Sequence, residues 1–477
     1  METVAPAPAS SPGVQRLSTI ERGLHLFTDV HPGEGLTAIV MFANVFLILC
    51  AYYFVKPLRD GWIAVSTFEG LSSVEVKAYT SFAQSLVLIG AMAIYARLVT
   101  RWPRREVITR TTLFCMSNLL IFWVLHSTHV AAAGVVFYIW VGMFGLFVVS
   151  QFWAFAADLY TDERGRRLLP MIAIGATAGA VAGSFITGAV VRSGLLDSSA
   201  LLLAANLPLL ASIVLTAVAD GRGPTGTGAP PTGKRLAAVP VTQDGGKHVG
   251  VRALVSGNHY LLAVAAVTLL THWVSTNGDN LLFRAVQEAL RNDLATRGVV
   301  DAGAMNVFVR EGTTAFYGSF FFWVNLSALL LQAFLASRLL KYGGFAVILL
   351  LLPAIDLVSY SAMAFLPFLL VVRVMKTAES ATSYSINNTA QQVLWLPTTP
   401  AMKYKAKPAI ETFFVRLGDG FAAMTVLIGV RFYALATRAL FLFNVALVVL
   451  WILVGMIVVR EHRRLCAGGK APASNGC

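Results

Sequence analysis

Charged side chains inside long apolar runs are the residues of this sequence most able to do chemistry. Lys56 and Arg59 lie where the first apolar run ends, and Arg284 closes a run in the second half of the chain. An ionisable group at mid-bilayer costs about 2.5 kcal/mol or more, so such groups are usually functional. Guanidinium and ammonium groups bind phosphate and carboxylate. The pattern predicts a cavity that holds an anionic substrate.

The same charges have a second explanation, because opposite charges on one helix can pair. Arg416 lies three residues before Asp419, and Lys376 lies three before Glu379, a spacing that lets helical side chains meet. We keep substrate binding and internal ion pairing as alternatives for each residue. The charged candidates for substrate binding are Lys56, Arg59, Asp279, Arg284, Arg373, Lys376 and Arg416.

Motifs for catalysis or metal binding are absent from the sequence. It has no HExxH, GxSxG or paired-cysteine pattern, and its four cysteines lack metal-ligand spacing. His126 and His129 flank a short connection with no carboxylate nearby, and His272 is typical of a core histidine or a proton relay. We therefore expect neither an enzyme nor a bound metal or cofactor.

The composition is typical of a membrane protein. We therefore expect the lipid bilayer to be a partner of the chain. Of its 477 residues, 57% are hydrophobic and 13% are charged, whereas soluble domains average roughly 25% charged residues. The net charge of +13 is spread over short connections between apolar runs. Because orientation signals are distributed in this way, we expect no nucleic-acid partner. The oligomeric state is left open.

Twelve apolar runs are long enough to cross about 30 Å of hydrocarbon. They fall into two groups of six: 36–55, 78–99, 107–126, 131–156, 168–191 and 198–219, then 260–284, 314–340, 344–366, 367–393, 408–433 and 436–459. The predicted fold is an all-α membrane protein with twelve transmembrane helices in two pseudo-symmetric six-helix bundles, as in major-facilitator carriers.

A Gly-, Pro- and Thr-rich stretch without a packable core separates the two groups. The predicted organisation is a disordered cytoplasmic arm (1–35), an N-terminal bundle (36–219), a cytoplasmic linker (220–258), a C-terminal bundle (259–459) and a cytoplasmic tail (460–477). Lys and Arg concentrate in alternate connections, so the positive-inside rule places the linker and both termini in the cytoplasm. We expect a bacterial inner membrane.

One connection departs from this charge pattern. The segment 285–313 carries Arg291, Arg297 and Arg310 on the side predicted to be outside. Four acidic residues share the segment, so we expect an outer connection that contains some helix.

Small residues recur on one face of the fifth span. Gly175, Gly179 and Gly183 fall at every fourth position, and such rows let two helix backbones approach closely in lipid. We expect this face to pack against a neighbouring helix.

The turn before this span is strongly charged. Asp158 precedes it, and Arg166 and Arg167 close it. These groups are too polar for hydrocarbon, so the turn lies in water. It is either a plain solvated connection or part of a gate.

The two halves also repeat each other weakly. YYFVKPLRD at the end of the first span aligns with DNLLFRAVQ in the seventh, which places Lys56 opposite Arg284. Equivalent spans of a pseudo-symmetric carrier approach one another near its central site. We therefore expect Arg59 and Arg284 to lie close together, with Asp60 and Asp279 as their resting partners.

Two longer stretches carry a resemblance to a known family. FWAFAADLYTDERGRRLLPMIAIGATAGAVAG and LWLPTTPAMKYKAKPAIETFFVRLGDG resemble the ATP:ADP antiporter family, the nucleotide transporters of plastids and intracellular bacteria. The likeness extends from YYFVKPLRD to about Gly420, and the second stretch is the more specific. The resemblance implies a twelve-helix carrier that exchanges nucleotides and binds their phosphates with cations.

The family's functional residues carry over in part. The basic residue before an aspartate at the end of span one is matched by Arg59, and the basic residue that closes the span-seven segment by Arg284. The acidic residue of that segment falls at Asn280, or at Asp279 with a slip of one residue. A lysine of the nucleotide carriers falls on Gln391, and an acidic residue in span four has no counterpart. These departures leave the identity of the cargo open.

The sequence thus predicts a secondary transporter of a small anionic, phosphate-bearing metabolite, with ATP/ADP exchange as the family default. One alternative is a carrier of another solute on the same fold, such as a lipid-like or peptide-like molecule. Another is a membrane scaffold or sensor that transports nothing. The charges kept inside the spans favour transport.

Overall fold

A computed structural model describes most of the chain. The described residues are 31–66, 68, 70–102, 104–126, 131–160, 162–194, 196–222, 257–298, 301–399, 402 and 406–468. Most of the predicted arm and linker, the end of the tail, and Lys403 and Lys405 of the KYKAK motif lie outside the described residues.

The N-terminal half consists of long helices joined by short connections. They are α2 (Gly35–Ala64), α3 (Ser73–Arg101), α4 (Arg104–His126), α5 (Ala131–Leu159), α6 (Asp162–Ser193), and the pair α7 (Ala200–Ala204) and α8 (Asn206–Asp220). The backbone of Ala205 between α7 and α8 stays helical, with φ −62° and ψ −23°. The pair therefore forms one continuous crossing.

The C-terminal half contains longer helices and several π-helical turns. Its helices are α10 (His259–Arg297), α11 (Ala302–Leu331), α12 (Ser337–Phe365), α13 (Leu369–Thr382), α14 (Asn388–Val393), α15 (Lys407–Ala409), α16 (Val415–Leu427) and α17 (Thr437–Gly468). The π-helical turns η1 (Gln332–Ala336), η2 (Ser383–Asn387), η4 (Ile410–Phe414) and η5 (Ile428–Phe432) directly follow α11, α13, α15 and α16. Such turns often occur at functional sites.

Within the described residues these elements make twelve helical crossings, six in each half. Ten of them are long and apolar enough to span a membrane by length and composition. The other two are α3 and the segment of α13, η2 and α14, which carries Arg373, Lys376 and Glu379. The predicted all-helical membrane fold is confirmed.

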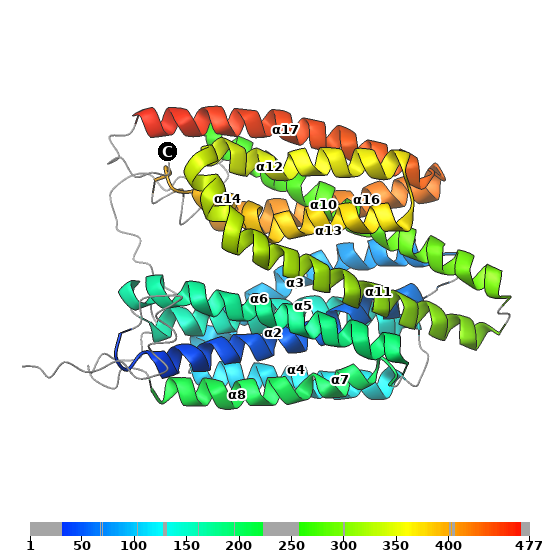
Figure 1. The fold of residues 1–477 in the computed structure, drawn as a ribbon, viewed down its shortest axis with the longest axis horizontal. Helices are drawn as coiled ribbons and strands as arrows, with labels where there is room; N and C mark the ends of the chain where they lie inside the picture. Colours follow the sequence, from blue (N-terminus) through cyan, green and yellow to red (C-terminus); the bar gives the residue numbers. More distant parts are fainter. Residues whose placement is uncertain are drawn as a thin grey trace, which may run out of the picture.

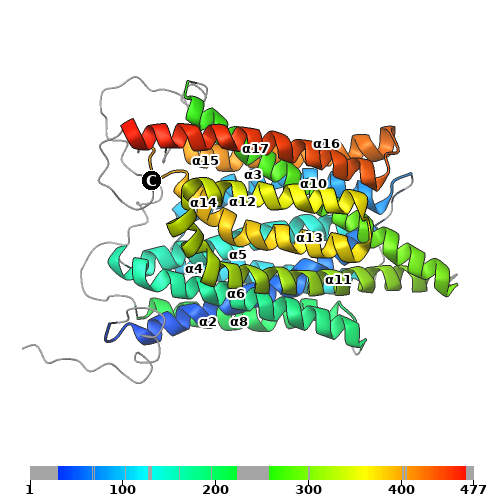
Figure 2. The same cartoon turned by 45° about the horizontal axis from the view of Figure 1, so that its top comes forward.

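The two halves lie side by side as two bundles (Figures 1 and 2). α11 packs against α6 and α2 of the other half, and α3 packs against α16. The start of α2, the end of α8, the start of α10 and the end of α17 lie at one end of the molecule, on the left in Figure 1. We call this end the linker end, and the opposite end the far end.

The predicted outer connection 285–313 differs from the structure, because almost all of it is helical. α10 continues to Arg297, and α11 begins at Ala302. Gly298 ends α10 in the left-handed conformation with φ 63°, which glycine adopts at little cost. Asp301 caps α11 by accepting the N–H of Ala304 at 2.6 Å. The two helices form a hairpin that projects from the far end (Figure 1).

The glycine row of α6 lies against the backbone of α2. A Cβ atom added at Gly175 would lie 2.8 Å from the carbonyl oxygen of Phe42, and one at Gly183 would lie 2.5 Å from that of Cys50. A Cβ at Gly179 would overlap the carbonyl oxygen of Phe46. Only glycine therefore fits along this contact.

Candidate substrate site between the two halves

Lys56 is a buried cation that lies where the two halves meet. It belongs to α2, its exposure is only 8%, and its Nζ lies over four aromatic rings. Phe321 of α11 is the nearest ring at 4.2 Å, followed by Tyr53 at 5.0 Å and by Tyr52 and Tyr384 at 5.7 Å. Tyr384 comes from the π-helical turn η2, so the C-terminal half supplies two of the four rings.

Lys56 has no ion-pair partner within the described part of the chain. The nearby carboxylates are engaged elsewhere, Asp60 by Lys77 at 3.2 Å and Asp279 by Lys376 at 3.0 Å. A cation over an aromatic ring gains about 0.5–2 kcal/mol, whereas a buried charge is ordinarily paired. Lys56 therefore lacks a carboxylate within ion-pairing distance among the described residues.

Arg59 lies three residues further along α2 and is held by a shared carboxylate. Its Nε lies 3.5 Å from Asp60, and its guanidinium lies 4.7 Å from the centre of the Tyr138 ring. Asp60, which is 2% exposed, also pairs with Lys77 of α3. Together with Lys56, the N-terminal half thus presents three cations and one anion at this level. This excess of positive charge favours an anion.

On the C-terminal side of this region, carboxylates outnumber cations. Lys376 of α13 is 1% exposed. Its Nζ pairs with Glu379 at 2.5 Å and with Asp279 at 3.0 Å, and donates to the carbonyl oxygen of Ser275 at 3.2 Å. Asp279 has a side-chain exposure of 61%. The described residues thus combine a cationic N-terminal side with an acidic C-terminal side.

The expected pairing of Arg284 with Asp279 is wrong, and no contact joins Arg284 to Arg59 among the described residues. Arg284 pairs with Glu288 one turn further along α10, at 2.9 Å, and donates to the carbonyl oxygen of Leu435 at the far end. Arg284 lies five positions after Asp279, and this spacing turns their side chains to different faces of a helix, whereas a spacing of four keeps them on one face.

Two other predicted cations lie outside the group around Lys56. Arg373 donates to the hydroxyl of Ser319 at 2.5 Å, which ties α13 to α11. Arg416 pairs with Asp419 at 3.0 Å, so of the two alternatives the structure shows the internal ion pair for this residue. Asp419 also accepts a hydrogen bond from Ser85 of α3, which makes this pair part of the contact between the halves.

The two residues placed by resemblance differ in their surroundings. Asn280 is 2% exposed, and its Nδ2 has no hydrogen-bond partner among the described residues. It follows Asp279 directly on α10. Gln391 is half-buried in α14, near the linker end.

The charged residues predicted as a turn before the fifth span are instead the first residues of α6, because the helix begins at Asp162, and they are tied to the start of α2. Arg167 donates to Glu34 at 3.2 Å, and Arg164 pairs with the same carboxylate at 3.0 Å. The backbone of Arg166 belongs to the same helix, and Asp158 is exposed near the end of α5. Glu34, which the sequence analysis did not single out, therefore joins two helices of one half at the linker end.

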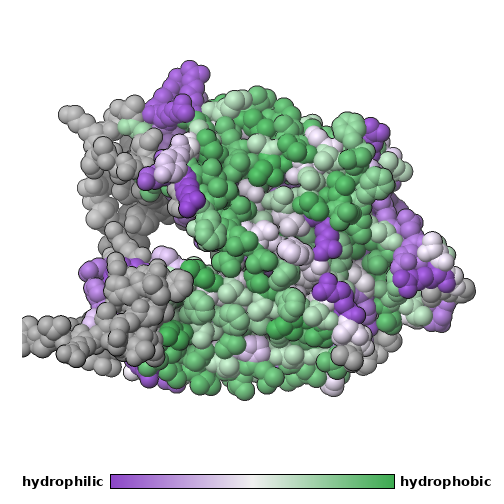
Figure 3. Space-filling view, in the orientation of Figure 1, coloured by the Kyte–Doolittle hydropathy of each residue, from purple (hydrophilic) through white to green (hydrophobic). Residues whose placement is uncertain are grey.

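The two halves are in close contact at the far end. Gly318 of α11 lies against Gly188 of α6, so that an added Cβ atom would lie 2.8 Å from the Gly188 nitrogen. Ser198 donates to Glu311 at 2.7 Å, and Arg310 pairs with Asp197 at 3.7 Å. At the linker end, the surface is hollowed between the halves (Figure 3). The far end is therefore the closed one.

Asp197 stays charged in this far-end contact. Burial alone would raise the pKa of its carboxyl, but the backbone N–H of Ser199, Arg310 and His126 together hold the pKa below its usual range. The ion pair to Arg310 therefore persists at neutral pH.

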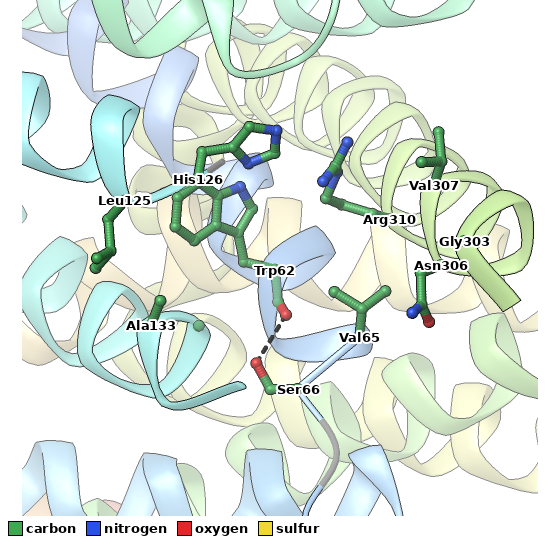
Figure 4. A pocket seen from close by; sticks show the side chains of 11 residues that line it. Trp62, Val65, Ser66, Leu125, His126, Ala133, Gly303, Asn306, Val307 and Arg310 are labelled. Carbon is green, nitrogen blue, oxygen red and sulfur yellow. Dashed lines mark hydrogen bonds between the residues drawn. The ribbon is translucent and has the colours of Figure 1, made fainter. Parts of the chain in front are cut away.

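A cavity of about 220 Å³ lies beside this contact (Figure 4). Trp62, His126, Asn306 and Arg310 are among the residues that line it. The indole Nε1 of Trp62 has no hydrogen-bond partner among the described residues, and Ser66 donates to the carbonyl oxygen of Trp62 at 3.0 Å. The cavity contains polar groups from both halves.

Sequence reasoning missed Lys77 and the aromatic rings around Lys56. Lys77 is 3% exposed and lies 4.2 Å from the centre of the Phe283 ring of α10. It directly precedes the apolar run 78–99, so a prediction that begins the span at 78 leaves it outside the membrane. Tyr52 and Tyr53 lie one turn before Lys56, and this helical spacing was the available signal for the ring contacts.

No metal centre is formed by the described residues, since no group of three or more His, Cys, Asp or Glu side chains could hold an ion.

No protein-family model matches the sequence, and no curated protein matches it either. The resemblance to the ATP:ADP antiporter family therefore stays a prediction.

Solved structures of membrane transporters share the fold over nearly the whole chain. A bacterial homolog of the human lysosomal transporter Spinster, inward-facing and unoccupied, matches with a TM-score of 0.57 and 13% identity, covering 93% of this chain and 100% of its own. The nucleoside transporter NupG matches with 0.59 and 12%, covering 89% and 99%. The human organic anion transporter MFSD10 (TETRAN) matches with 0.52 and 14%, covering 89% and 100%. The chain therefore shares the all-helical fold of these structures, which is the major-facilitator fold.

Proposed function

We propose that this protein is a secondary transporter that carries a small anionic, phosphate-bearing metabolite, with ATP and ADP as the first substrates to test. The observation that carries the proposal is Lys56, a buried cation between the halves with aromatic contacts and no ion pair among the described residues. An anion bound there would supply the missing negative charge. The rings of Tyr52 and Tyr384 offer flat surfaces for a planar group such as a base.

Arg59 would act as the second contact of the anion. Its guanidinium can donate two parallel hydrogen bonds to a phosphate or carboxylate. Asp60 does not depend on Arg59 alone, because it keeps its ion pair with Lys77. Arg59 can therefore turn toward a substrate without leaving a buried carboxylate unpaired.

Transport on this fold requires the site to open alternately to the two ends. The far end is closed by the contacts of α11 with α6, while the surface is hollowed at the linker end. Rocking of one half against the other around Lys56 would exchange the two states. We place the linker end in the cytoplasm of a bacterial inner membrane, as the distribution of Lys and Arg favours.

A second candidate cargo is a zwitterion such as a small peptide. Asp279 faces the same region from the acidic C-terminal side, with a side-chain exposure of 61%. A solute with both charges could place its anionic end at Lys56 and its cationic end at Asp279. A nucleotide would use the cationic side alone.

Uptake of labelled ATP into proteoliposomes, with a panel of competing anions and a dipeptide, tests the proposal. Replacing Lys56 by Met keeps much of the side-chain volume and removes the charge. A hydrogen bond to a charged group is worth about 1.5–3 kcal/mol, so Lys56→Met should lower uptake about tenfold or more. Lys341→Met is the matched control, because Lys341 is exposed, and its uptake should stay at the wild-type level.

Each outcome assigns the cargo class or rejects it. Competition by phosphate-bearing anions but not by the dipeptide supports the first candidate, and the reverse supports the second. Equal uptake by wild type and Lys56→Met would contradict both.

A further inference from the structure

A buried carboxyl group in the C-terminal half has no hydrogen-bond donor or ion-pair partner, among the described residues, that would stabilise its ionised form. Asp356 of α12 is 1% exposed, and its Oδ1 has no hydrogen-bond partner among the described residues. An isolated ionised carboxylate is very costly in a medium of low dielectric constant, so such a group becomes neutral instead. Asp356 is therefore a candidate for holding a proton.

The neighbouring donors are already used by other acceptors. Lys376 has three N–H donors, which are directed to Glu379, Asp279 and the carbonyl oxygen of Ser275. The hydroxyl of Tyr360 lies one turn beyond Asp356 on α12 and donates to Glu379 at 2.8 Å. Neither group has a donor left for Asp356.

The charges around Asp356 do not balance without a proton. The charged groups that act on it are Glu379 and Lys376 of α13, and Asp279 of α10 pairs with the same lysine. From η2, Tyr384 lies near Glu379. Helix α17 contributes Asn444, a neutral side chain that donates to the carbonyl oxygen of Val274. Around the buried pair, one ammonium thus faces three carboxyl groups, of which only Asp279 also lies near Lys56.

We propose that Asp356 and Glu379 form a proton-binding site, and that its proton is carried in the same direction as the anionic cargo. The step is the association of one proton with one carboxylate, which gives a neutral carboxylic acid. Asp279 is the exposed member of the cluster, so the proton would enter there. Lys376 would donate one of its own protons to Glu379 and accept the proton from Asp279, so that it ends as an ammonium again. This inference rests on the proposed function for the cargo, but not for the proton site.

Proton uptake would also reduce the electrostatic cost of transport. An anion bound at Lys56 adds negative charge beside Asp279, which repels the ionised form of the cluster. Protonation of the cluster removes one negative charge, so the loaded carrier moves less net charge through the bilayer. Binding of the anion at Lys56 would then raise the affinity of the cluster for a proton, and protonation of the cluster would raise the affinity for the anion.

Infrared spectroscopy of the purified full-length protein in lipid nanodiscs tests the proton site without any substrate. At about pH 7, where an ordinary Asp or Glu is ionised, wild type should show the carbonyl stretch of a protonated carboxylic acid, shifted in heavy water. Asp356→Asn mimics the neutral acid, so it should fold and lose this band. Glu379→Gln is the second variant and should weaken the band. Glu288→Gln, at a half-exposed carboxylate of the far end, is the control and should leave it unchanged.

A transport measurement then tests the coupling. For one coupled proton, a gradient of about one pH unit corresponds to about a tenfold accumulation ratio. Labelled ATP in wild-type proteoliposomes should respond in this way to an imposed gradient, and Asp356→Asn should not respond. Absence of the band in wild type, or its survival in both variants, would overturn the proton site. If the band behaves as expected but the gradient acts equally on wild type and Asp356→Asn, the coupling is wrong. Absence of all anion uptake would reject the proposed cargo.

Discussion

At the scale of single residues, Lys56 and Arg59 lie one turn apart on α2 but are held in different ways. Arg59 shares Asp60 with Lys77, whereas Lys56 is surrounded by aromatic rings. A ring contact returns about 0.5–2 kcal/mol, and a lone charge at mid-bilayer costs about 2.5 kcal/mol or more. Lys56 therefore gains most from an arriving anion.

Arg59→Ala should abolish anion uptake while leaving the protein folded. The fold should survive because Asp60 keeps its ion pair with Lys77 at 3.2 Å, while the substrate loses a paired hydrogen-bond donor. Arg284→Ala is the matched control, since Arg284 pairs with a carboxylate of 52% exposure, and such pairs contribute only about 0–1 kcal/mol. Initial uptake rates and thermal unfolding of both variants in the same membranes check the prediction.

The double variant Arg59→Ala with Asp60→Ala separates substrate binding from simple ion pairing. If Arg59 only neutralised Asp60, removal of both would restore uptake. Restored uptake would reject the binding role of Arg59, whereas continued loss would support it.

Residue types identified part of the candidate site, and three-dimensional neighbours supplied the rest. Lys56 and Arg59 were predicted from their charge near the end of an apolar run. The structure places Lys56 against rings of both halves and Arg59 beside Tyr138 of its own half. Arg284 was misplaced because a weak repeat fixes the alignment of a helix but not the face on which a side chain lies. Lys77 was missed because its partners, Asp60 and the ring of Phe283, are distant in sequence.

At the scale of the elements, the contact of α6 with α2 depends on the absence of side chains. Gly179→Leu should lower the thermal stability of the protein, because a Cβ atom there already overlaps the carbonyl oxygen of Phe46. Overpacking costs typically about 1–3 kcal/mol. Gly90→Leu is the control, since a Cβ atom at Gly90 of α3 meets no neighbouring atom within 4 Å. Equal unfolding temperatures for the two variants would contradict this account of the contact.

The elements were largely predictable from the apolar runs, while their ends were not. Each run gives a helical crossing, because lipid leaves the backbone no alternative partner. The hairpin of α10 and α11 extends beyond the bilayer length, where the hydrophobic pattern stops. There Gly298, the Asp301 cap and the ion pair of Arg297 with Asp293 at 3.0 Å hold the helices. Such local signals are too short to predict where a helix ends beside the strong apolar pattern.

At the scale of the whole molecule, the two ends should face opposite sides of the membrane. Thr232→Cys in the linker should react with an impermeant thiol reagent only after the cells are permeabilised. Leu196→Cys, at a far-end position of 57% exposure, should react in intact cells. In both variants Cys466 and Cys477 are replaced by Ser, so that they do not react with the reagent. Cys50 and Cys115 can stay, because they are buried. Labelling of the linker from outside would reverse the proposed orientation.

Binding to the purified full-length protein tests most directly whether Lys56 holds an anionic cargo. A ligand at about 100 times its Kd stabilises the folded state by about 2.7 kcal/mol, so ATP, ADP, inorganic phosphate and uncharged adenosine can be ranked by thermal unfolding. We expect the phosphate-bearing ligands to stabilise wild type and Lys341→Met, and Lys56→Met to bind them about tenfold more weakly or worse. Equal stabilisation of Lys56→Met, or adenosine binding as tightly as ATP, would contradict the assignment of Lys56 as the anion site.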